Sequence, residues 1–289
     1  MSSAKVAFIG VTGMLGKPVA HELINAGFQV YALGRNEKKV KDIFGDKVFF
    51  IPLDLKDRKS VENSLAGMDF VYLNLSIKPY EKEKDFHTEY QGLNYVIEAC
   101  RKHKIKRIGY ISSIIALKYQ HDDWWVMRIK KQAIRAIQNS GIPYCIFYPS
   151  SFMENFLNSF KRNGFILVIS GFKNKNWWIA GKDYGMYVAR SFQILDGGES
   201  RDYIVQGPDP LTMEEAADIF VRSSRRKFRK IKIPLVLMKF ASKFSDFANY
   251  GYRILDIIES IPEPFMSQKT WDELGRPTIT IEKFASDYV

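Results

Sequence analysis

The segment Gly10–Gly16, with the sequence GVTGMLG, has three glycines at intervals of three residues. An apolar run at 5–9 precedes it, and apolar residues at helical spacing follow it at 17–27. Glycines allow the backbone to approach a ligand closely, and the N–H groups at a helix N-terminus stabilise a phosphate. A tight strand-to-helix turn also requires glycine for steric reasons alone. The position between a strand and a helix favours a nucleotide-binding loop.

The first half of the chain alternates short β-rich runs with segments of helical spacing. Strands that are apolar on both faces and separated by helices indicate a parallel sheet covered on both sides. The pattern predicts a doubly wound α/β (Rossmann) domain. The expected strands are residues 5–10, 29–35, 48–55, 70–76, 107–114 and 144–151, and the expected helices are residues 18–27, 60–68, 87–103 and 125–141.

The regular alternation weakens after Ser151. A capping box, Thr212 with Glu215 three residues later, predicts the start of one further helix. We therefore expect a Rossmann domain at 1–150 and a smaller, mixed substrate lobe at 151–289 that partly returns to the Rossmann core. The expected elements of this second part are a short helix at 152–160, a buried strand at 164–170, a helix at 183–195 and a strand at 201–207.

The net charge of +11 comes mainly from one segment, residues 222–243, which contains nine Lys or Arg and no acidic residue. A basic amphipathic segment of this kind could bind an anionic membrane surface or an acidic partner. Alternatively, it is a solvated helix end, a strand and a buried helix, and we favour this reading because the second lobe needs apolar residues for its core. No recognised nucleic-acid-binding module accompanies the charge, so nucleic acid is not expected as a partner. The nine residues are Arg222, Arg225, Arg226, Lys227, Arg229, Lys230, Lys232, Lys239 and Lys243.

The cysteine and histidine patterns argue against a disulfide-stabilised protein and against a metal-binding protein. Cys100 and Cys145 cannot form a disulfide framework, and the four histidines have no metal-ligand spacing. The N-terminal residues contain no signal-peptide pattern, and no apolar stretch approaches the roughly 20 residues that span a bilayer. We expect a cytoplasmic protein without a bound metal.

The end of the second predicted strand distinguishes between the two nicotinamide cofactors. NAD-binding sites usually have Asp or Glu at this position, which bonds the ribose 2′-hydroxyl. This chain has Gly34 and Arg35, with Lys38 and Lys39 beyond them. A guanidinium suits bidentate binding of a 2′-phosphate, although these residues also fit a solvated helix start. The sequence predicts NADP, with NAD as the alternative.

Three segments resemble the NmrA-like group of atypical short-chain dehydrogenases/reductases. They are residues 6–35, residues 140–156 (SGIPYCIFYPSSFMENF) and residues 275–288 (GRPTITIEKFASDY). Together they indicate a resemblance over essentially the whole chain. One departure lies in the second segment, where Tyr148 replaces the arginine that the family has before the proline.

The resemblance implies a nicotinamide-nucleotide site at the ends of the strands. Phosphates would lie against the loop, adenine beside the third strand, and ribose and nicotinamide beside the fourth. The implied cofactor-binding residues are Gly10, Thr12, Gly13, Met14, Leu15, Gly16, Arg35, Asp54, Leu55, Asn74, Leu75, Ser76, Ser112, Lys130, Tyr148, Pro149 and Ser150.

The candidate catalytic residues are Ser112 and Lys130. Classical members of the superfamily use a Ser and a Tyr-x-x-x-Lys, in which Lys lowers the pKa of Tyr. Val126 stands four residues before Lys130, and Tyr119 is too far along the chain to share a helical face with it. The resemblance implies that Lys130 acts without that tyrosine, and the alternative is that Lys130 belongs to a basic solvent face.

The residues just before Lys130 form a second candidate cluster. His121, Asp122, Asp123, Trp124 and Trp125 would either line an aromatic substrate pocket or serve as helix capping and core packing.

These features favour an NADPH-dependent oxidoreductase that reduces a carbonyl or an activated double bond of a small apolar molecule. The alternative is a nucleotide-binding protein without turnover, acting as a redox sensor or as an assembly or accessory protein. The missing tyrosine and the basic segment favour the alternative, whereas the loop fits both.

Overall fold

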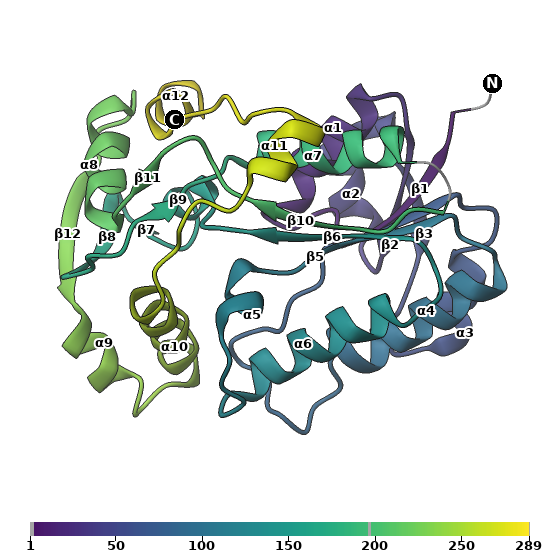
Figure 1. The fold of residues 1–289 in the computed structure, drawn as a ribbon, viewed down its shortest axis with the longest axis horizontal. Coiled ribbons are helices and arrows are strands. Elements are labelled where there is room, and N and C mark those ends of the chain that lie inside the picture. Colours follow the sequence, from purple (N-terminus) through teal and green to yellow (C-terminus); the bar gives the residue numbers. More distant parts are fainter. Residues whose placement is uncertain (1–2, 196–197, 289) are drawn as a thin grey trace.

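The central sheet has seven strands in the order β10-β6-β5-β4-β1-β2-β3, and every neighbouring pair is parallel. The computed structural model describes residues 3–195 and 198–288 (Figure 1). The strand order reverses between β1 and β4, which confirms the doubly wound fold and locates its switch point there. The strands are β1 (Lys5–Ile9), β2 (Gln29–Gly34), β3 (Phe49–Pro52), β4 (Phe70–Leu73), β5 (Arg107–Ile111), β6 (Tyr144–Pro149) and β10 (Arg201–Val205).

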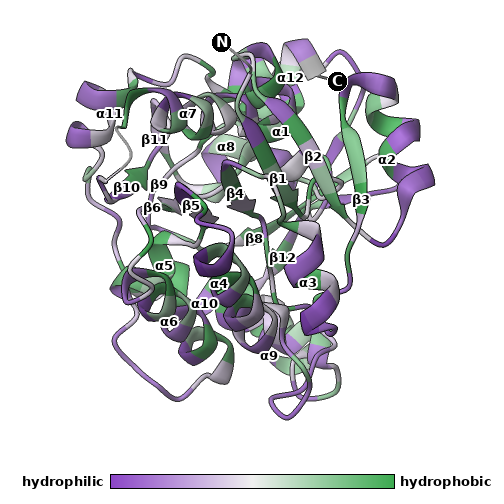
Figure 2. Cartoon of the chain, turned by 90° about the vertical axis from the view of Figure 1, so that its right-hand side faces the viewer, coloured by the Kyte–Doolittle hydropathy of each residue, from purple (hydrophilic) through white to green (hydrophobic). Residues whose placement is uncertain are grey.

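Helices cover both faces of this sheet, because alternate side chains of each strand point to opposite sides. Phe8 packs in the cluster under α1, α2, α7 and α11, whereas Ala7 packs in the cluster under α3, α4 and α6. The covering helices alternate hydrophobic and hydrophilic stretches along their length (Figure 2). Their bounds are α1 (Gly16–Asn25), α2 (Glu37–Phe44), α3 (Arg58–Ser64), α4 (Leu93–Lys102), α5 (Ile114–Lys118), α6 (Trp125–Gln138), α7 (Gly181–Ile194) and α11 (Gln268–Leu274).

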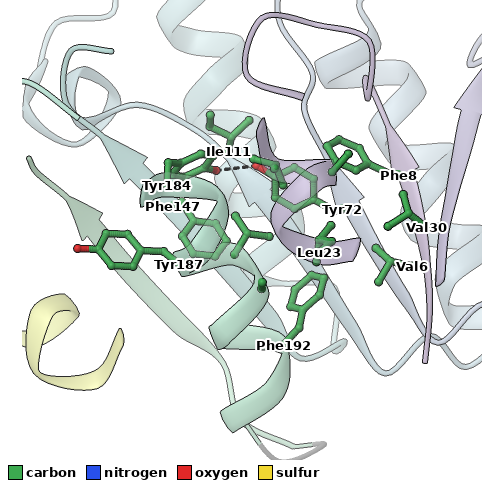
Figure 3. Packing of buried hydrophobic residues seen from close by; sticks show 14 of the residues in the cluster. Val6, Phe8, Leu23, Val30, Tyr72, Ile111, Phe147, Tyr184, Tyr187 and Phe192 are labelled. Atoms are coloured by element: carbon green, nitrogen blue, oxygen red, sulfur yellow. Dashed lines mark hydrogen bonds between the residues drawn. The ribbon is translucent and has the colours of Figure 1, made fainter. Parts of the chain in front are cut away.

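Tyrosine hydroxyls inside the first cluster are paired with each other. The hydroxyls of Tyr72 on β4 and Tyr184 on α7 lie 2.6 Å apart, beside Phe147 and Ile111 (Figure 3). This bond satisfies two polar groups that would otherwise destabilise the core. It also joins α7, from the second half of the chain, to the middle of the sheet.

The second half of the chain builds a lobe at the carboxyl end of the sheet and then returns to it. The lobe contains the sheet β12-β8-β7, a strand pair β11-β9, and helices packed on them (Figure 1). The expected capping box of Thr212 and Glu215 is present at the start of α8. The elements are β7 (Lys161–Arg162), β8 (Phe165–Ser170), β9 (Asn176–Trp177), β11 (Pro210–Leu211), α8 (Met213–Ser223), β12 (Arg229–Pro234), α9 (Leu235–Ala241), α10 (Asp246–Ser260) and α12 (Ile281–Tyr288).

Two local predictions are wrong. The short helix expected at 152–160 is only a 3₁₀ turn over Met153–Phe156. The basic segment does not end in a buried helix, since α9 contains no buried residue. None of the described helices is long and apolar enough to cross a membrane.

Candidate functional site

The register of the sheet brings the predicted site residues to one edge. Ile9 on β1 stands opposite Leu33 on β2 and Leu73 on β4, so the residues that follow these three strands lie side by side. The carboxyl ends of parallel strands form the crevice in which doubly wound folds bind ligands. The predicted groups at this edge are 10–16 after β1, Arg35 after β2, 54–55 after β3, 74–76 after β4, Ser112 after β5, and 148–150 at the end of β6.

The glycine loop is held against β4 by close backbone contacts. Gly10 has φ +90°, and a Cβ there would lie 2.3 Å from the Asn74 carbonyl oxygen. A Cβ on Gly16 would lie 2.3 Å from the Gly10 oxygen and 2.5 Å from the Val11 oxygen. The Asn74 side-chain amide donates to the Gly10 oxygen at 3.2 Å. Glycine at Gly10 and Gly16 is therefore a steric requirement of the turn itself.

The N-terminus of α1, which follows the loop, has no side-chain cap. The first turn of this helix contains no acidic residue. Among the described residues no acceptor is found for the N–H groups of Met14 and Leu15. These donors, together with the positive end of the helix dipole, suit a phosphate group. The loop thus fits the pyrophosphate of a dinucleotide on geometry as well as on sequence.

Arg35 is exposed at the end of β2 and, within the described part of the chain, forms no ion pair. Its neighbour Asn36 caps α2 by accepting the Lys39 N–H at 2.9 Å. The register places Ile9 opposite Leu33, so Arg35 after β2 lies at the same edge of the sheet as the glycine loop after β1. The guanidinium is thus available to an anion bound beside the loop.

The two residues expected on the adenine side, Asp54 and Leu55, lie in the turn after β3. Asp54 is exposed and accepts the Lys56 N–H at 3.0 Å, while its own N–H donates to Ser60 Oγ at 3.1 Å. Leu55 packs close to Gly92, where an added Cβ would lie 3.3 Å from it. These bonds order the turn after β3 at the same edge as the loop.

Lys130 is bound to a buried carboxylate that the sequence did not reveal. Its Nζ lies 2.9 and 3.3 Å from the two oxygens of Glu89, which is fully buried. Tyr110 Oη donates to the same carboxylate at 2.7 Å, and the Ile77 N–H donates to it at 3.2 Å. Burial and the Glu89 charge raise the pKa of Tyr110 well above its ordinary value. Lys130 is therefore fixed beside the segment that follows β4.

Glu89 was not recognised because it lies inside a helical apolar pattern. It belongs to a π-helical turn, Thr88–Gly92, that leads into α4. The extra residue of such a turn shifts the helical period, so periodicity does not indicate which face Glu89 occupies. An acidic residue among buried apolar positions was the only signal.

Ser112 and Tyr148 are both buried at the ends of their strands. Ser112 Oγ lies near Tyr110 but makes no hydrogen bond of good geometry among the described residues. Tyr148 packs on the α6 side of the sheet and donates to Asp202 Oδ1 at 2.9 Å. Burial raises the pKa of Tyr148. The Tyr148 side chain is thus part of the core, and its backbone continues to the edge through Pro149.

A cavity of about 200 Å³ lies beyond the ends of β5 and β6, between α5 and α10. Isoleucine is the most frequent residue in its wall, with six of the fifteen lining residues. Lys118, whose Nζ donates to the Pro262 carbonyl at 2.7 Å, also lines it, and burial lowers the pKa of Lys118. Glu263 accepts Ser150 Oγ–H at 2.8 Å, and burial raises the pKa of Glu263. The lining residues are Ser113, Ile114, Ile115, Lys118, Pro149, Ser150, Ser151, Phe152, Asn155, Asn176, Ile254, Ile257, Ile258, Ile261 and Glu263.

Sequence reasoning found only Pro149 and Ser150 of this cavity. Ile254, Ile257 and Ile258 of its wall come from α10, which is more than one hundred residues from the ends of β5 and β6. Ser113 caps α5 by accepting the Ile115 N–H at 3.2 Å, which directs that helix along the cavity. The one local sequence feature that indicated this helix was Ser113, a capping residue two positions after the fifth strand.

The aromatic cluster before Lys130 is a packing element. Trp124 is buried against Tyr250 on α10, with ring centroids 5.5 Å apart. Asp123 accepts the Tyr119 hydroxyl at 2.6 Å, and Asp122 pairs with Lys131 at 2.9 Å. Core packing by tryptophan is confirmed. Capping by aspartate is wrong, because Trp124 is the N-cap of α6 and no side chain caps it.

A second buried carboxyl group lies near the glycine loop. Glu154 Oε1 accepts the Gly181 N–H at 2.8 Å at the start of α7, whereas Oε2 is buried and has no hydrogen-bond partner among the described residues. A Cβ on Gly181 would lie 2.8 Å from Pro18 of α1. Burial raises the pKa of Glu154 to about 7. Among residues 3–195 and 198–288, no group of three His, Cys, Asp or Glu is suited to hold a metal ion.

A comparison with protein families gives one match over most of the chain. The model of the NmrA-like family matches residues 2–259. Prestalk A differentiation protein A of Dictyostelium discoideum is 27% identical, over 79% of this chain and 73% of that protein. Photosystem II assembly factor Ycf39 of Cyanophora paradoxa is 21% identical, over 87% of this chain and 78% of that protein.

Solved structures with the same fold include two reductases. The NADPH-dependent quinone oxidoreductase of Escherichia coli, complexed with NADPH, superposes with a TM-score of 0.75 at 21% identity, over 97% of this chain and 98% of that chain. The triphenylmethane reductase of a Citrobacter species, complexed with NADP(H), has a TM-score of 0.73 at 20% identity, over 96% and 98% of the two chains. At these identities the likeness establishes the fold.

Proposed function

Because this chain belongs to the NmrA-like family, we propose that it binds NADPH at the carboxyl edge of the sheet and reduces a small apolar carbonyl compound, such as a quinone. One observation carries the proposal. A helix N-terminus without a side-chain cap, an arginine with no ion pair among the described residues, and a cavity rich in isoleucine lie along one edge of a parallel sheet. The two similar reductases, whose structures contain NADPH or NADP(H), support it.

The cofactor is assigned to the loop side of this edge. The free N–H groups of Met14 and Leu15 bind the pyrophosphate. Arg35 binds the 2′-phosphate, since no Asp or Glu stands at the end of β2 to bond a free ribose hydroxyl. Bound NADPH supplies the hydride.

Lys130 serves as a positioning cation in this proposal. Its ammonium group has three N–H donors, and the Glu89 carboxylate holds it in one place beside Ile77. A remaining donor reaches the ribose and nicotinamide side that the segment after β4 forms. The two bonds to Glu89 therefore fix the position of the Lys130 ammonium group.

The substrate is assigned to the cavity. Its volume of about 200 Å³ admits a small molecule, and its isoleucine wall favours an apolar one. Lys118 is the cationic side chain among the lining residues. The ammonium group of Lys118 orients the carbonyl oxygen and donates the proton that this oxygen needs when the carbon receives the hydride. The lowered pKa of Lys118 makes it a better acid than an exposed lysine.

Calorimetric titration with NADPH and with NADH tests the cofactor assignment. We expect NADPH to bind at least about tenfold more tightly, and Arg35→Ser to remove this preference, because a charge-assisted bond to phosphate contributes about 1.5–3 kcal/mol. Lys47→Ser is the matched control, since Lys47 is exposed and precedes β3 at the opposite edge. Binding of neither nucleotide, or equal weakening of both by Arg35→Ser, contradicts the proposal.

A second function, nucleotide binding without turnover in an assembly or accessory role, is favoured by one observation. Val126 occupies the position of the usual catalytic tyrosine, so Lys130 has no tyrosine to activate on its own helix. The similar Ycf39 proteins are named as assembly factors. NADPH oxidation with a panel of quinones and aromatic aldehydes separates the two functions. Turnover that Lys118→Met slows by about tenfold or more supports the reductase, and tight NADPH binding without any turnover supports the accessory role.

A further inference from the structure

Helix α9, the turn after it and the start of α10 expose large apolar side chains to solvent. We call residues 235–247 the cap. Phe244 is 76% exposed, Val236 68%, Phe247 65%, Phe240 62% and Leu237 58%. Isolated exposed apolar residues are ordinary on soluble proteins, but five within thirteen residues form a patch that needs an explanation.

The exposure follows from how α9 packs. Leu235 and Met238, one turn apart, contact the core of the lobe. At 100° per residue, Val236, Leu237 and Phe240 point away from that contact face. The rings of Phe240 and Phe244 lie 5.2 Å apart, so the apolar face continues around the turn. Helix α9 is therefore apolar on the side where a surface helix is normally polar.

Positive charge accompanies this apolar face. Lys239 and Lys243 lie within the cap, and the segment from Arg222 to Lys243 contains no acidic residue. Only Lys230 and Lys232 of its nine basic residues form ion pairs within the described part of the chain, with Asp218 and Glu214 on α8. The remaining basic side chains are not neutralised by the protein itself.

We propose that the cap is a docking surface for an anionic lipid bilayer. Phe240, Phe244 and the neighbouring aliphatic side chains enter the boundary between headgroups and acyl chains, while Lys239 and Lys243 contact the lipid phosphates. The basic residues before β12 add electrostatic attraction. The proposal concerns a surface remote from the glycine loop and does not depend on the proposed reductase activity.

Shape and charge favour a bilayer over a second copy of the chain. The cap is a convex corner where α9 meets the start of α10 (Figure 1). Its phenylalanines line neither the substrate cavity nor the hollow that Lys239 and Lys243 form with Asp123 and Asp256. A two-fold dimer through the cap would bring Lys239 and Lys243 of both copies together, and the one acidic residue of the cap, Asp246, already pairs with Lys82. A bilayer of anionic lipids supplies the opposite charge across the whole face.

Docking would also place the proposed substrate cavity near lipid. Helix α10 begins in the cap, and Ile254, Ile257 and Ile258 of the same helix line the cavity. The helix spans roughly 22 Å. A membrane-dissolved substrate would therefore meet the cavity on the docked side.

Vesicle sedimentation with the whole chain of 289 residues tests the proposal. The probes are vesicles of phosphatidylcholine alone and of phosphatidylcholine with phosphatidylserine. We expect binding only to the serine-containing vesicles, weakened by about tenfold or more between about 50 mM and 500 mM NaCl. The variant Phe240→Ser/Phe244→Ser should bind at least about tenfold more weakly, and Lys239→Ser/Lys243→Ser should bind more weakly with less salt dependence.

Two matched controls lie outside the cap. Phe49→Ser removes a phenylalanine that is 51% exposed on β3, and Lys47→Ser removes an exposed lysine beside it. Both should bind vesicles like the wild-type protein. Because all substituted side chains are exposed, the variants should unfold at nearly the wild-type temperature.

Four results would overturn the proposal. The first is no binding to serine-containing vesicles at low salt, and the second is binding that the Phe240→Ser/Phe244→Ser variant retains in full. The third is self-association in sedimentation velocity without vesicles, abolished by the same variant, which would assign the cap to a second copy. The fourth is equally tight binding to soluble polyglutamate that the Phe240→Ser/Phe244→Ser substitutions do not weaken, which would assign the basic residues to an acidic protein.

Discussion

The carboxyl edge of the sheet and the cap use their side chains in opposite ways. At the edge, backbone atoms approach so closely that Gly10 and Gly16 leave no room for a Cβ, and the charged groups Glu89 and Lys130 are buried together. In the cap, phenylalanines stand in solvent and lysines have no partner among the described residues. The buried residues of the edge thus make their contacts within the protein, whereas the side chains of the cap are available for contacts with another surface.

This contrast implies that substitutions at the two regions act on different properties. Changes to the buried groups of the edge alter the free energy of unfolding, because those groups have close partners within the protein. Changes in the cap leave stability nearly unchanged and alter only binding to an external surface.

Removing the positive partner of Glu89 should have the largest effect on stability. Lys130→Met leaves a fully buried carboxylate with only the Tyr110 and Ile77 hydrogen bonds. We expect a loss of about 3–5 kcal/mol in the free energy of unfolding, measured in urea. The double variant Lys130→Met/Glu89→Gln should recover most of it. In the cap, Lys239→Met should change stability by less than about 0.5 kcal/mol. A small effect of Lys130→Met would mean that the buried pair is dispensable for folding.

A methyl group in the glycine loop should act next most strongly. Gly16→Ala forces a Cβ against the carbonyl oxygens of Gly10 and Val11, at 2.3 and 2.5 Å. We expect a loss of about 2–3 kcal/mol and of NADPH binding in calorimetry. Gly34→Ala, where an added Cβ meets nothing within 4 Å, is the matched control for stability. Unchanged NADPH binding by Gly16→Ala would contradict the role of the loop.

The buried carboxyl of Glu154 should make stability depend on pH. Burial raises the pKa of Glu154 from 4.5 to about 7, so the folded protein holds this proton more tightly than the unfolded chain does. Its contribution to stability is therefore full below pH 4.5 and is lost as the pH rises through about 7.

Between about pH 5.5 and pH 8 the loss should be about 2 kcal/mol, measured by urea unfolding at each pH. Glu154→Gln keeps an acceptor for the Gly181 N–H and should remove this part of the pH dependence. Parallel pH profiles for the wild type and the variant would show that Glu154 does not titrate in this range.

The smallest effect is expected in α10, with the opposite sign. Gly251 lies inside this helix, and a Cβ there would meet only Met238, at 3.9 Å. Gly251→Ala should stabilise the protein by about 0.5–1 kcal/mol, because alanine loses less backbone entropy in a helix. A destabilisation, seen as a lower urea midpoint, would mean that α10 is packed as tightly as the loop.

Much of the fold was predictable because it depends on local patterns. The six strands of the first half were recognised from apolar runs, and the Thr212 capping box from two residues three apart. The site was only half predictable. Residues such as Arg35 and Asn74 follow directly after strands, so a parallel sheet brings them together. Glu89 and Lys118 lie within helices or turns, and their orientation depends on the packing of those elements.

The basic segment illustrates the limit of composition as evidence. Its apolar residues were expected to fill the core of the lobe, but only part of them do so, including Leu235 and Met238. The sequence of α9 contains more apolar residues than one helix face can bury. The sequence of this segment does not indicate whether another element covers the remaining apolar residues of α9.

The sequence by itself determined the six strands of the first half, the glycine loop and the absence of an acid after β2, because each depends on residues within a few positions of one another. The tertiary structure alone decided that Glu89 meets Lys130 across 41 residues, that α10 closes a cavity beside β5 and β6, and that the cap stays uncovered. These outcomes depend on which distant segments pack together. The energy of a buried charge or an exposed phenylalanine is set by those neighbours and not by its own position in the chain.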